Sequence, residues 1–234
     1  MNPTSARART ASATLAVLTF AACSSPSGES SDAPAATPGS STPTAAPATP
    51  TPAPTPTEEA PLASDGRPMR ADLSIPKIGL FDLAVLPYRG WTDDAPGTEI
   101  QNTGRAASPH GPRGGTGPGG VGNYQVTAHR LSSTRAFLRL PELERGDRVR
   151  VRTKNATYVY RITGTRRTSF RSPKSLRAQR AAVPGNPGQE PTRAMITLST
   201  CATLEDHAAG NYWYDEFDNP EHRIDKIGVL LAIR

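Results

Sequence analysis

Short runs of alternating apolar and polar residues recur through the C-terminal part of the chain, and this pattern predicts β-strands. In the run 122–129, Tyr124, Val126 and Ala128 fall on one side, and His129 falls on the other. The runs span 71–80, 83–88, 122–129, 147–153, 156–162, 193–200 and 226–233. Several short strands in one domain favour an all-β fold, in the form of a closed or nearly closed barrel.

The connections between these strands are mostly short. The runs 147–153 and 156–162 are separated by "KNA" and predict a hairpin. Helical periodicity is scarce, and only 133–143 is expected to supply a turn or a short helix. The Gly- and Pro-rich stretch 108–122 predicts a loop.

The first 64 residues have a different composition and are not expected to join the domain. Residues 1–22 contain Arg7, Arg9 and a short apolar run, as in a bacterial secretory signal peptide, and the run is too short to span a bilayer. "AAC" then places Cys23 where a lipoprotein would be diacylated; the alternative is ordinary cleavage after Ala22. Residues 23–64 are rich in Pro, Ser, Thr and Ala, which predicts a disordered spacer. The folded domain is expected over 65–234.

Charge narrows the possible partners. The chain carries a net charge of +6, and because its first 64 residues carry −2, the expected domain carries +8. A basic extracytoplasmic domain is attracted to anionic lipid or wall polymers. The basic residues are not interleaved with a stacking motif of aromatic residues, so we expect no nucleic-acid partner.

The chain has two cysteines, and if Cys23 is acylated, Cys201 has no disulfide partner. An unpaired thiol in an oxidising compartment is either inert and buried or chemically used. A thiolate nucleophile needs a base or a positive neighbour. Of four histidines, His129 is the best candidate, because its strand can pair beside the strand that ends at Cys201.

Three segments in this order resemble the sortase family, over roughly residues 70–234. "GNYQVTAHR" is similar to the family's strand with the catalytic histidine, "ITLSTC" matches its TLxTC motif, and "HRIDKIGVLLAI" is similar to its final strand with the catalytic arginine. "LSIPKIGL" and "FLRLPELERGDRVRV" agree with the family pattern. The actinobacterial class E group is the most similar. The segment 202–222 is longer than usual for the family.

The resemblance implies a closed barrel of about eight strands with short helices, and it implies catalytic roles for Cys201, His129 and Arg223. Thr200 and Arg130 are expected to contribute to substrate binding. The implied reaction cleaves a C-terminal sorting signal of the Leu-Ala-x-Thr-Gly or Leu-Pro-x-Thr-Gly type through a thioacyl enzyme. The acceptor is then a peptidoglycan-linked or pilin amine. No cofactor or metal is expected. The protein is expected to be a monomer that a lipid anchors to the outer face of the cell membrane.

The sequence lacks the signatures of several other enzymes and sites. An L,D-transpeptidase carries a Ser-His-Gly-Cys signature that is absent here, and papain-like wall hydrolases place cysteine before histidine. A metal site built from Cys201, Asp206, His207 and His222 matches no compact zinc pattern. The acidic stretch "YDEFDN" lacks an ordered set of calcium ligands. A non-catalytic lipoprotein that binds cell-wall polymer would need neither the thiol nor His129.

Overall fold

The computed structural model describes residues 62–234. The expected leader over 1–22, the lipidation site Cys23 and nearly all of the expected spacer over 23–64 lie outside the described residues. Within 62–234, no helix has both the length and the apolar character that a membrane span requires.

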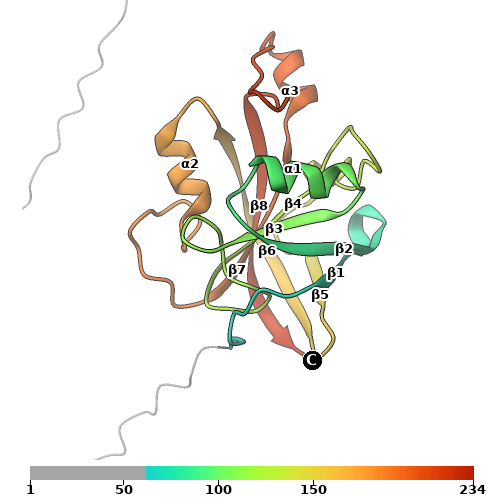
Figure 1. The fold of residues 1–234 in the computed structure, drawn as a ribbon. Helices are drawn as coiled ribbons and strands as arrows, with labels where there is room; N and C mark the ends of the chain where they lie inside the picture. Colours follow the sequence, from blue (N-terminus) through green and yellow to red (C-terminus); the bar gives the residue numbers. More distant parts are fainter. Residues whose placement is uncertain (1–61) are drawn as a thin grey trace, which may run out of the picture. The chain divides into compact units, whose positions relative to one another are not determined.

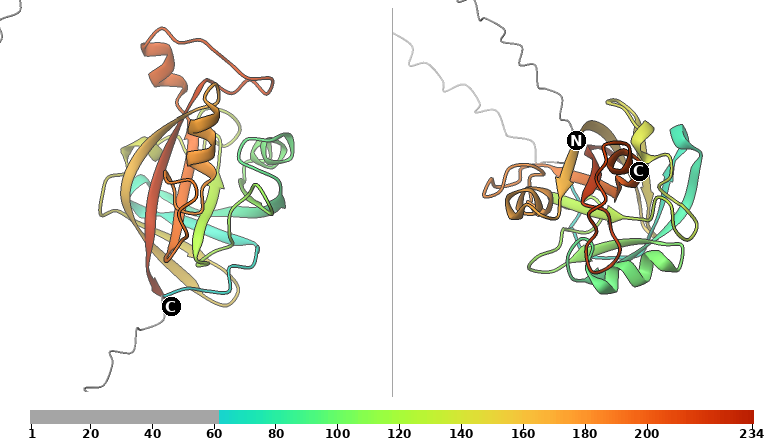
Figure 2. Two further views of the ribbon diagram at one scale, coloured as in Figure 1. Left: turned by 90° about the vertical axis from the view of Figure 1, so that its left-hand side faces the viewer. Right: turned by 90° about the horizontal axis from the view of Figure 1, so that it is seen from above.

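Eight strands close into a barrel in the order β1-β2-β3-β4-β7-β8-β6-β5 (Figures 1 and 2). The strands are β1 (Ala71–Ile75), β2 (Leu80–Arg89), β3 (Ala106–His110), β4 (Gly122–Thr127), β5 (Arg148–Arg152), β6 (Thr157–Ser169), β7 (Ala194–Cys201) and β8 (His222–Ile233). Neighbours pair antiparallel except β2 with β3 and β4 with β7, which are parallel. The closed all-β barrel expected from the alternating pattern is therefore confirmed.

The barrel interior is filled by the apolar side of each alternating run. Tyr124 and Val126 of β4 are buried there with Ile196 and Leu198 of β7. The opposite faces of these two strands carry polar residues instead, namely Asn123, Gln125, Thr127, Thr197 and Ser199, and these side chains are also buried. The outer face of β4 and β7 must therefore be covered by other segments of the chain.

Pairing of the central strands brings three distant segments to one rim. β4 pairs with β7 in parallel register, from Gly122 opposite Ala194 to Thr127 opposite Ser199. Both strands consequently end at the same rim, which confirms the neighbourhood expected for His129 and Cys201. β8 runs antiparallel to β7, and its second residue, Arg223, lies directly opposite Cys201.

Three short α-helices and two 3-10 turns lie outside the barrel wall. They are α1 (Ala95–Asn102), α2 (Pro173–Arg180), α3 (Thr203–Ala208), η1 (Pro76–Ile78) and η2 (Leu140–Glu142). The turn or short helix expected over 133–143 is found as the single turn η2. The side chains of Asp94 and Ser172 accept hydrogen bonds from the first-turn amides of α1 and α2, respectively. Figure 2 shows α2 alongside the barrel wall, on a different side from α1.

Candidate active site

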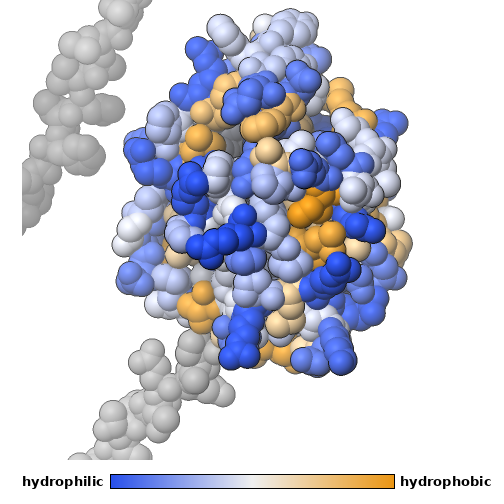
Figure 3. All heavy atoms as spheres, viewed as in Figure 1, coloured by the Kyte–Doolittle hydropathy of each residue, from blue (hydrophilic) through white to orange (hydrophobic). Residues whose placement is uncertain are grey.

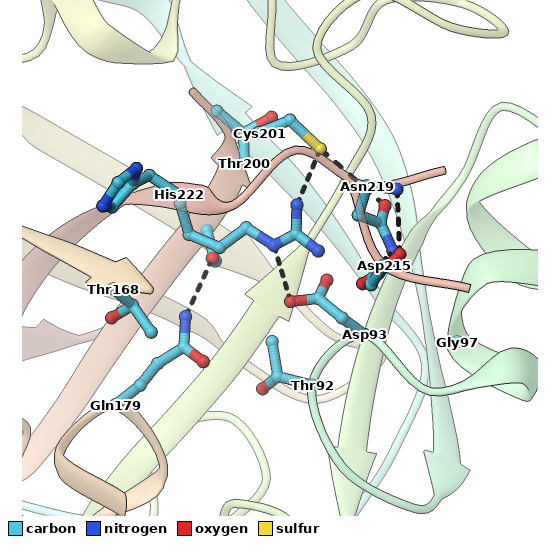
Figure 4. Close-up of polar contacts among 12 residues, drawn as sticks. Thr92, Asp93, Gly97, Thr168, Gln179, Thr200, Cys201, Asp215, Asn219 and His222 are labelled. Atoms are coloured by element: carbon cyan, nitrogen blue, oxygen red, sulfur yellow. Dashed lines mark hydrogen bonds and ion pairs between the residues drawn. The ribbon is translucent and has the colours of Figure 1, made fainter. Parts of the chain in front are cut away.

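Cys201 and Arg223 form a directly opposed pair across the last two strands of the barrel wall. The Nη1 atom of Arg223 donates a hydrogen bond to the Cys201 sulfur over 2.9 Å (Figure 4). The arginine is buried, with 4% of its surface exposed, and Cys201 is half-buried. The antiparallel register therefore brings the cation directly opposite the thiol.

Asp93 holds the other side of the guanidinium. Its Oδ2 accepts a hydrogen bond from Nε of Arg223 over 2.7 Å (Figure 4). Asp93 stands just before α1 with a φ of 66°, a left-handed conformation that aspartate tolerates better than most residues. The next residue, Asp94, fixes this turn by accepting hydrogen bonds from the backbone amides of Trp91 and Gly97, each over 3.0 Å. The sequence analysis missed Asp93.

These neighbours set the protonation of the thiol. Burial raises the pKa of Cys201, Arg223 lowers it, and the carboxylates of Asp93 and Asp215 raise it again, with a net upward shift. Burial also lowers the pKa of Arg223, but Asp93 and Cys201 outweigh that effect, so the guanidinium stays charged. The resting site therefore holds a thiol beside a permanent cation.

His129 follows the end of β4 and lines the same pocket as Cys201, a cavity of about 360 Å³. Its Nε2 atom lies 2.8 Å from Oδ1 of Asn102, the last residue of α1. Burial lowers the pKa of His129, the charge of Arg223 lowers it further, and Asp93 opposes both effects. The imidazole is therefore neutral in the resting site, and Asn102 orients its ring.

Thr200 and Arg130 form hydrogen bonds with the backbone around His129 and Cys201. Thr200 is fully buried, and its hydroxyl donates to the carbonyl oxygen of Ala128 over 2.8 Å, which ties β7 to the residue before His129. Arg130 forms a two-pronged ion pair with Glu205 of α3, and its Nη1 atom lies 3.4 Å from the Cys201 carbonyl oxygen. Both residues thus have structural partners within the protein, and their expected role in substrate binding stays a prediction.

The long segment between β7 and β8 folds over the thiol. Oδ1 of Asn219 lies 3.9 Å from the Cys201 sulfur, and Nδ2 of Asn219 donates to Asp215 over 3.1 Å (Figure 4). Asp215 also accepts hydrogen bonds from the backbone amides of Phe217 and Asn219. The unusual length of 202–222 was visible in the sequence, but the contact of Asn219 with the thiol was not.

A second cavity, of about 510 Å³, adjoins Arg223. It is lined by Arg223 and Asp93 and by apolar side chains that include Trp91, Phe170 and Leu176. Phe217 lines both this cavity and the pocket of His129, so the β7–β8 segment separates them. Cys201 and His129 thus line the 360 Å³ pocket, whereas Arg223 lines the 510 Å³ cavity together with apolar and charged side chains.

Among residues 62–234, no group of three or more His, Cys, Asp and Glu side chains is arranged to hold a metal ion. The residues of the alternative metal site have other partners. Asp206 accepts hydrogen bonds from His222 and Arg167, and His207 contacts the Tyr214 hydroxyl over 2.6 Å.

The barrel and its rim define a class of protein, the β-barrel enzymes with a thiol set beside an arginine. The sortase domain matches residues 73–213, which is well over half of the chain. The chain therefore belongs to the sortase family, whose members are cysteine transpeptidases that act at the cell envelope on proteins bearing sorting signals. The family expected from the three ordered motifs is thus confirmed.

Solved structures agree on the fold. The SrtA sortase from Actinomyces oris is 21% identical with a TM-score of 0.54, over 76% of this chain and 89% of that one. Sortase E1 from Streptomyces coelicolor, solved with a tripeptide in its active site, is 23% identical with a TM-score of 0.51, over 74% and 93%. Sortase E from Streptomyces avermitilis is 22% identical with a TM-score of 0.50, over 73% and 92%. Among curated proteins, none matches the chain.

Proposed function

We propose that this sortase cleaves a C-terminal sorting signal after threonine and transfers the acyl group to an amine, with Cys201 as nucleophile, His129 as acid and base, and Arg223 as oxyanion donor. The observation that carries the proposal is the 2.9 Å contact between the Arg223 guanidinium and the Cys201 sulfur. Without the pairing of β7 with β8, no cation would be held in a fixed position beside this thiol. The signal is of the Leu-Ala-x-Thr-Gly or Leu-Pro-x-Thr-Gly type.

The reaction proceeds in two halves. The Cys201 thiolate attacks the threonine carbonyl carbon, and Arg223 donates hydrogen bonds to the oxygen that becomes negative. The C–N bond breaks as His129 protonates the leaving glycine amine, which leaves a thioester on Cys201. In the second half, His129 takes a proton from the incoming amine, the amine attacks the thioester, and the thiolate leaves.

The two pKa shifts determine which ionised form can react. With the pKa of Cys201 raised and that of His129 lowered, thiol and neutral imidazole predominate. The reactive pair, thiolate and imidazolium, has the same total number of protons and is a minor form of the same state. When the substrate displaces Asn219 and places its threonine carbonyl against Arg223, the thiolate of this minor form attacks that carbonyl.

The two cavities give the substrate a direction. The leaving amine must face His129, so the C-terminal part of the signal and later the acceptor amine occupy the 360 Å³ pocket. The acyl part then occupies the 510 Å³ cavity on the opposite side, whose Trp91, Phe170 and Leu176 suit the aliphatic first residue of the signal.

The remaining parts of the proposal concern location and acceptor. Diacylated Cys23 anchors the protein to the outer face of the membrane, and residues 23–64 act as a spacer between membrane and barrel. The acceptor is an amine on peptidoglycan or on a pilin. The basic character of the domain supports a location near anionic wall or lipid polymers.

The test is product formation from a sorting-signal peptide and a small amine, followed by mass spectrometry. Cys201→Ala is expected to form no product, and His129→Ala and Arg223→Ala should each lose about 10²-fold or more in turnover. Arg148→Ala, which removes an exposed arginine from β5, serves as the matched control and should resemble the wild type. Persistent product with Cys201→Ala would refute the assignment of the nucleophile.

A further inference from the structure

Three arginines from two segments converge on a cavity that the proposed reaction does not use. Arg177 and Arg180 lie in α2, and Arg113 lies in the loop between β3 and β4. The cavity has a volume of about 490 Å³, and no acidic side chain lines it. We call it the arginine pocket. The side of the molecule that α2 occupies in Figure 1 is mostly hydrophilic at its surface (Figure 3).

The three guanidinium groups have few partners within the protein. Within residues 62–234, none of them forms an ion pair with a carboxylate. Arg113 stacks on the Trp91 ring at 3.5 Å from its centroid, and Arg180 donates to the Thr92 carbonyl oxygen over 3.3 Å. The Nε atom of Arg180 is buried and has no hydrogen-bond partner among the described residues. An anion would supply what these donors lack.

The local fold explains only part of this arrangement. Basic residues in the last turn of a helix are favoured by the helix dipole, which accounts for Arg177 and Arg180. It does not account for Arg113, which comes from a loop remote in sequence. Burial lowers the pKa of Arg180, and the nearby charge of Arg113 lowers it further, while Asp93 opposes the shift. The protein therefore holds two like charges close together.

The arginine pocket continues the cavity expected to hold the acyl part of the substrate. The two cavities share Leu176 and Arg180. In the proposed reaction, the leaving group faces His129, so the chain before the scissile threonine runs away from His129 and toward α2. We propose that the arginine pocket binds an acidic side chain of the substrate, located N-terminal to the sorting signal. This inference rests on the proposed function and adds a preference for substrates with an acidic flank.

A carboxylate suits this set of donors. The planar guanidinium group offers paired N–H donors that match the two oxygens of a carboxylate, and more than one arginine can share them. Arg113 and Arg177 are exposed, so a flanking side chain can reach them from solvent. Other sources of the same chemistry are a free phosphate ion and a carboxylate on the acceptor amine.

The experiment compares three sorting-signal peptides that differ only in two flanking residues, which are acidic, neutral or basic. With wild type, kcat/KM is expected to be about tenfold higher for the acidic than for the basic flank, as for a charge-assisted contact at a partly exposed site. In Arg177→Glu and Arg113→Glu this ratio should fall to one or invert. Lys174→Glu makes the same charge change on α2 outside the pocket and should keep the wild-type ratio.

Binding to Cys201→Ala, measured by fluorescence anisotropy with the same peptides, separates failure of this inference from failure of the proposed reaction. A charge-dependent Kd that responds to Arg177→Glu supports the pocket even if no peptide is turned over. Turnover and binding that are independent of the flank overturn it. Two further results would overturn the inference. One is that inorganic phosphate at millimolar concentration inhibits turnover of all three peptides equally. The other is that Arg177→Glu changes only the dependence of turnover on a carboxylate-bearing acceptor.

Discussion

Arg223 is shared between a thiol and a carboxylate, and this sharing sets the chemistry of the rim. Cys201, His129 and Arg223 could be proposed from the sequence, because each lies at the end of a recognisable strand within an ordered set of motifs. Asp93 could not, because a "DD" pair in a polar turn reads as a solvated loop. Its role depends on a contact across 130 positions of sequence, which no local pattern encodes.

The pH dependence of kcat/KM tests the sharing directly. The plot of kcat/KM against pH should be bell-shaped. Its acidic limb reports His129 and should lie below the usual histidine pKa of about 6.5, and its basic limb reports Cys201 and should lie above the usual thiol pKa of about 8.5. Asp93 raises the pKa of both groups, so Asp93→Asn should move both limbs to lower pH. Asp65→Asn, at an exposed position, should leave the profile unchanged. Limbs that stay in place in Asp93→Asn would contradict this electrostatic account.

At the scale of elements, alternation was informative wherever one face of a strand met the core. It failed for β3 (Ala106–His110), because "AASPH" contains proline and little large apolar surface, and the sequence therefore predicts a loop over 108–110. It also gave no sign of α1 and α2, which are short and polar. The capping residues Asp94 and Ser172, each followed closely by proline, were the available signals for these helices.

Asn123 of β4 contributes to the docking of α2 on the outer face of the barrel. Its Nδ2 atom donates to the carbonyl oxygens of Gln179 and Ala181, each over 3.1 Å, and its Oδ1 accepts from Thr197 over 2.8 Å. Asn123→Ala should lower the free energy of unfolding by about 1–3 kcal/mol, because it leaves buried polar groups unpaired. Chemical denaturation measures this change. The exposed Asn155→Ala should have almost no effect, and equal stabilities for the two variants would mean that α2 is held by other contacts.

At the scale of the whole molecule, the sequence predicted a closed barrel but not the order of its strands. Alternation identifies strands one at a time, whereas the parallel pairs β2·β3 and β4·β7 join segments that are distant along the chain. The strand order brings together Cys201, which lines one cavity, and Arg223, which lines the other. The proposed leader, lipid anchor and spacer depend on residues before 65 and need a separate test.

The proposed anchor predicts a specific mature N-terminus. If Cys23 is diacylated, mass spectrometry of the membrane-extracted protein should find Cys23 as the first residue, carrying a diacylglycerol. Two acyl chains bury many CH₂ groups at about 0.8 kcal/mol each, which is enough for firm attachment. Cys23→Ala should lose the modification and serves as the control. An unmodified Cys23, or another first residue, would refute the lipid anchor without affecting the barrel.

The position of β7 and β8 has a consequence for biogenesis. These two strands come last in the chain, yet in the barrel they stand between β4 and β6. Until these two strands are in place, β4 and β6 are open edges that can pair wrongly with another chain. The thiol and its cation come together in the same event that closes the wall. A chain that lacks β7 and β8 is therefore prone to aggregation and has no paired thiol and cation, and the reactive pair forms only once the barrel has closed.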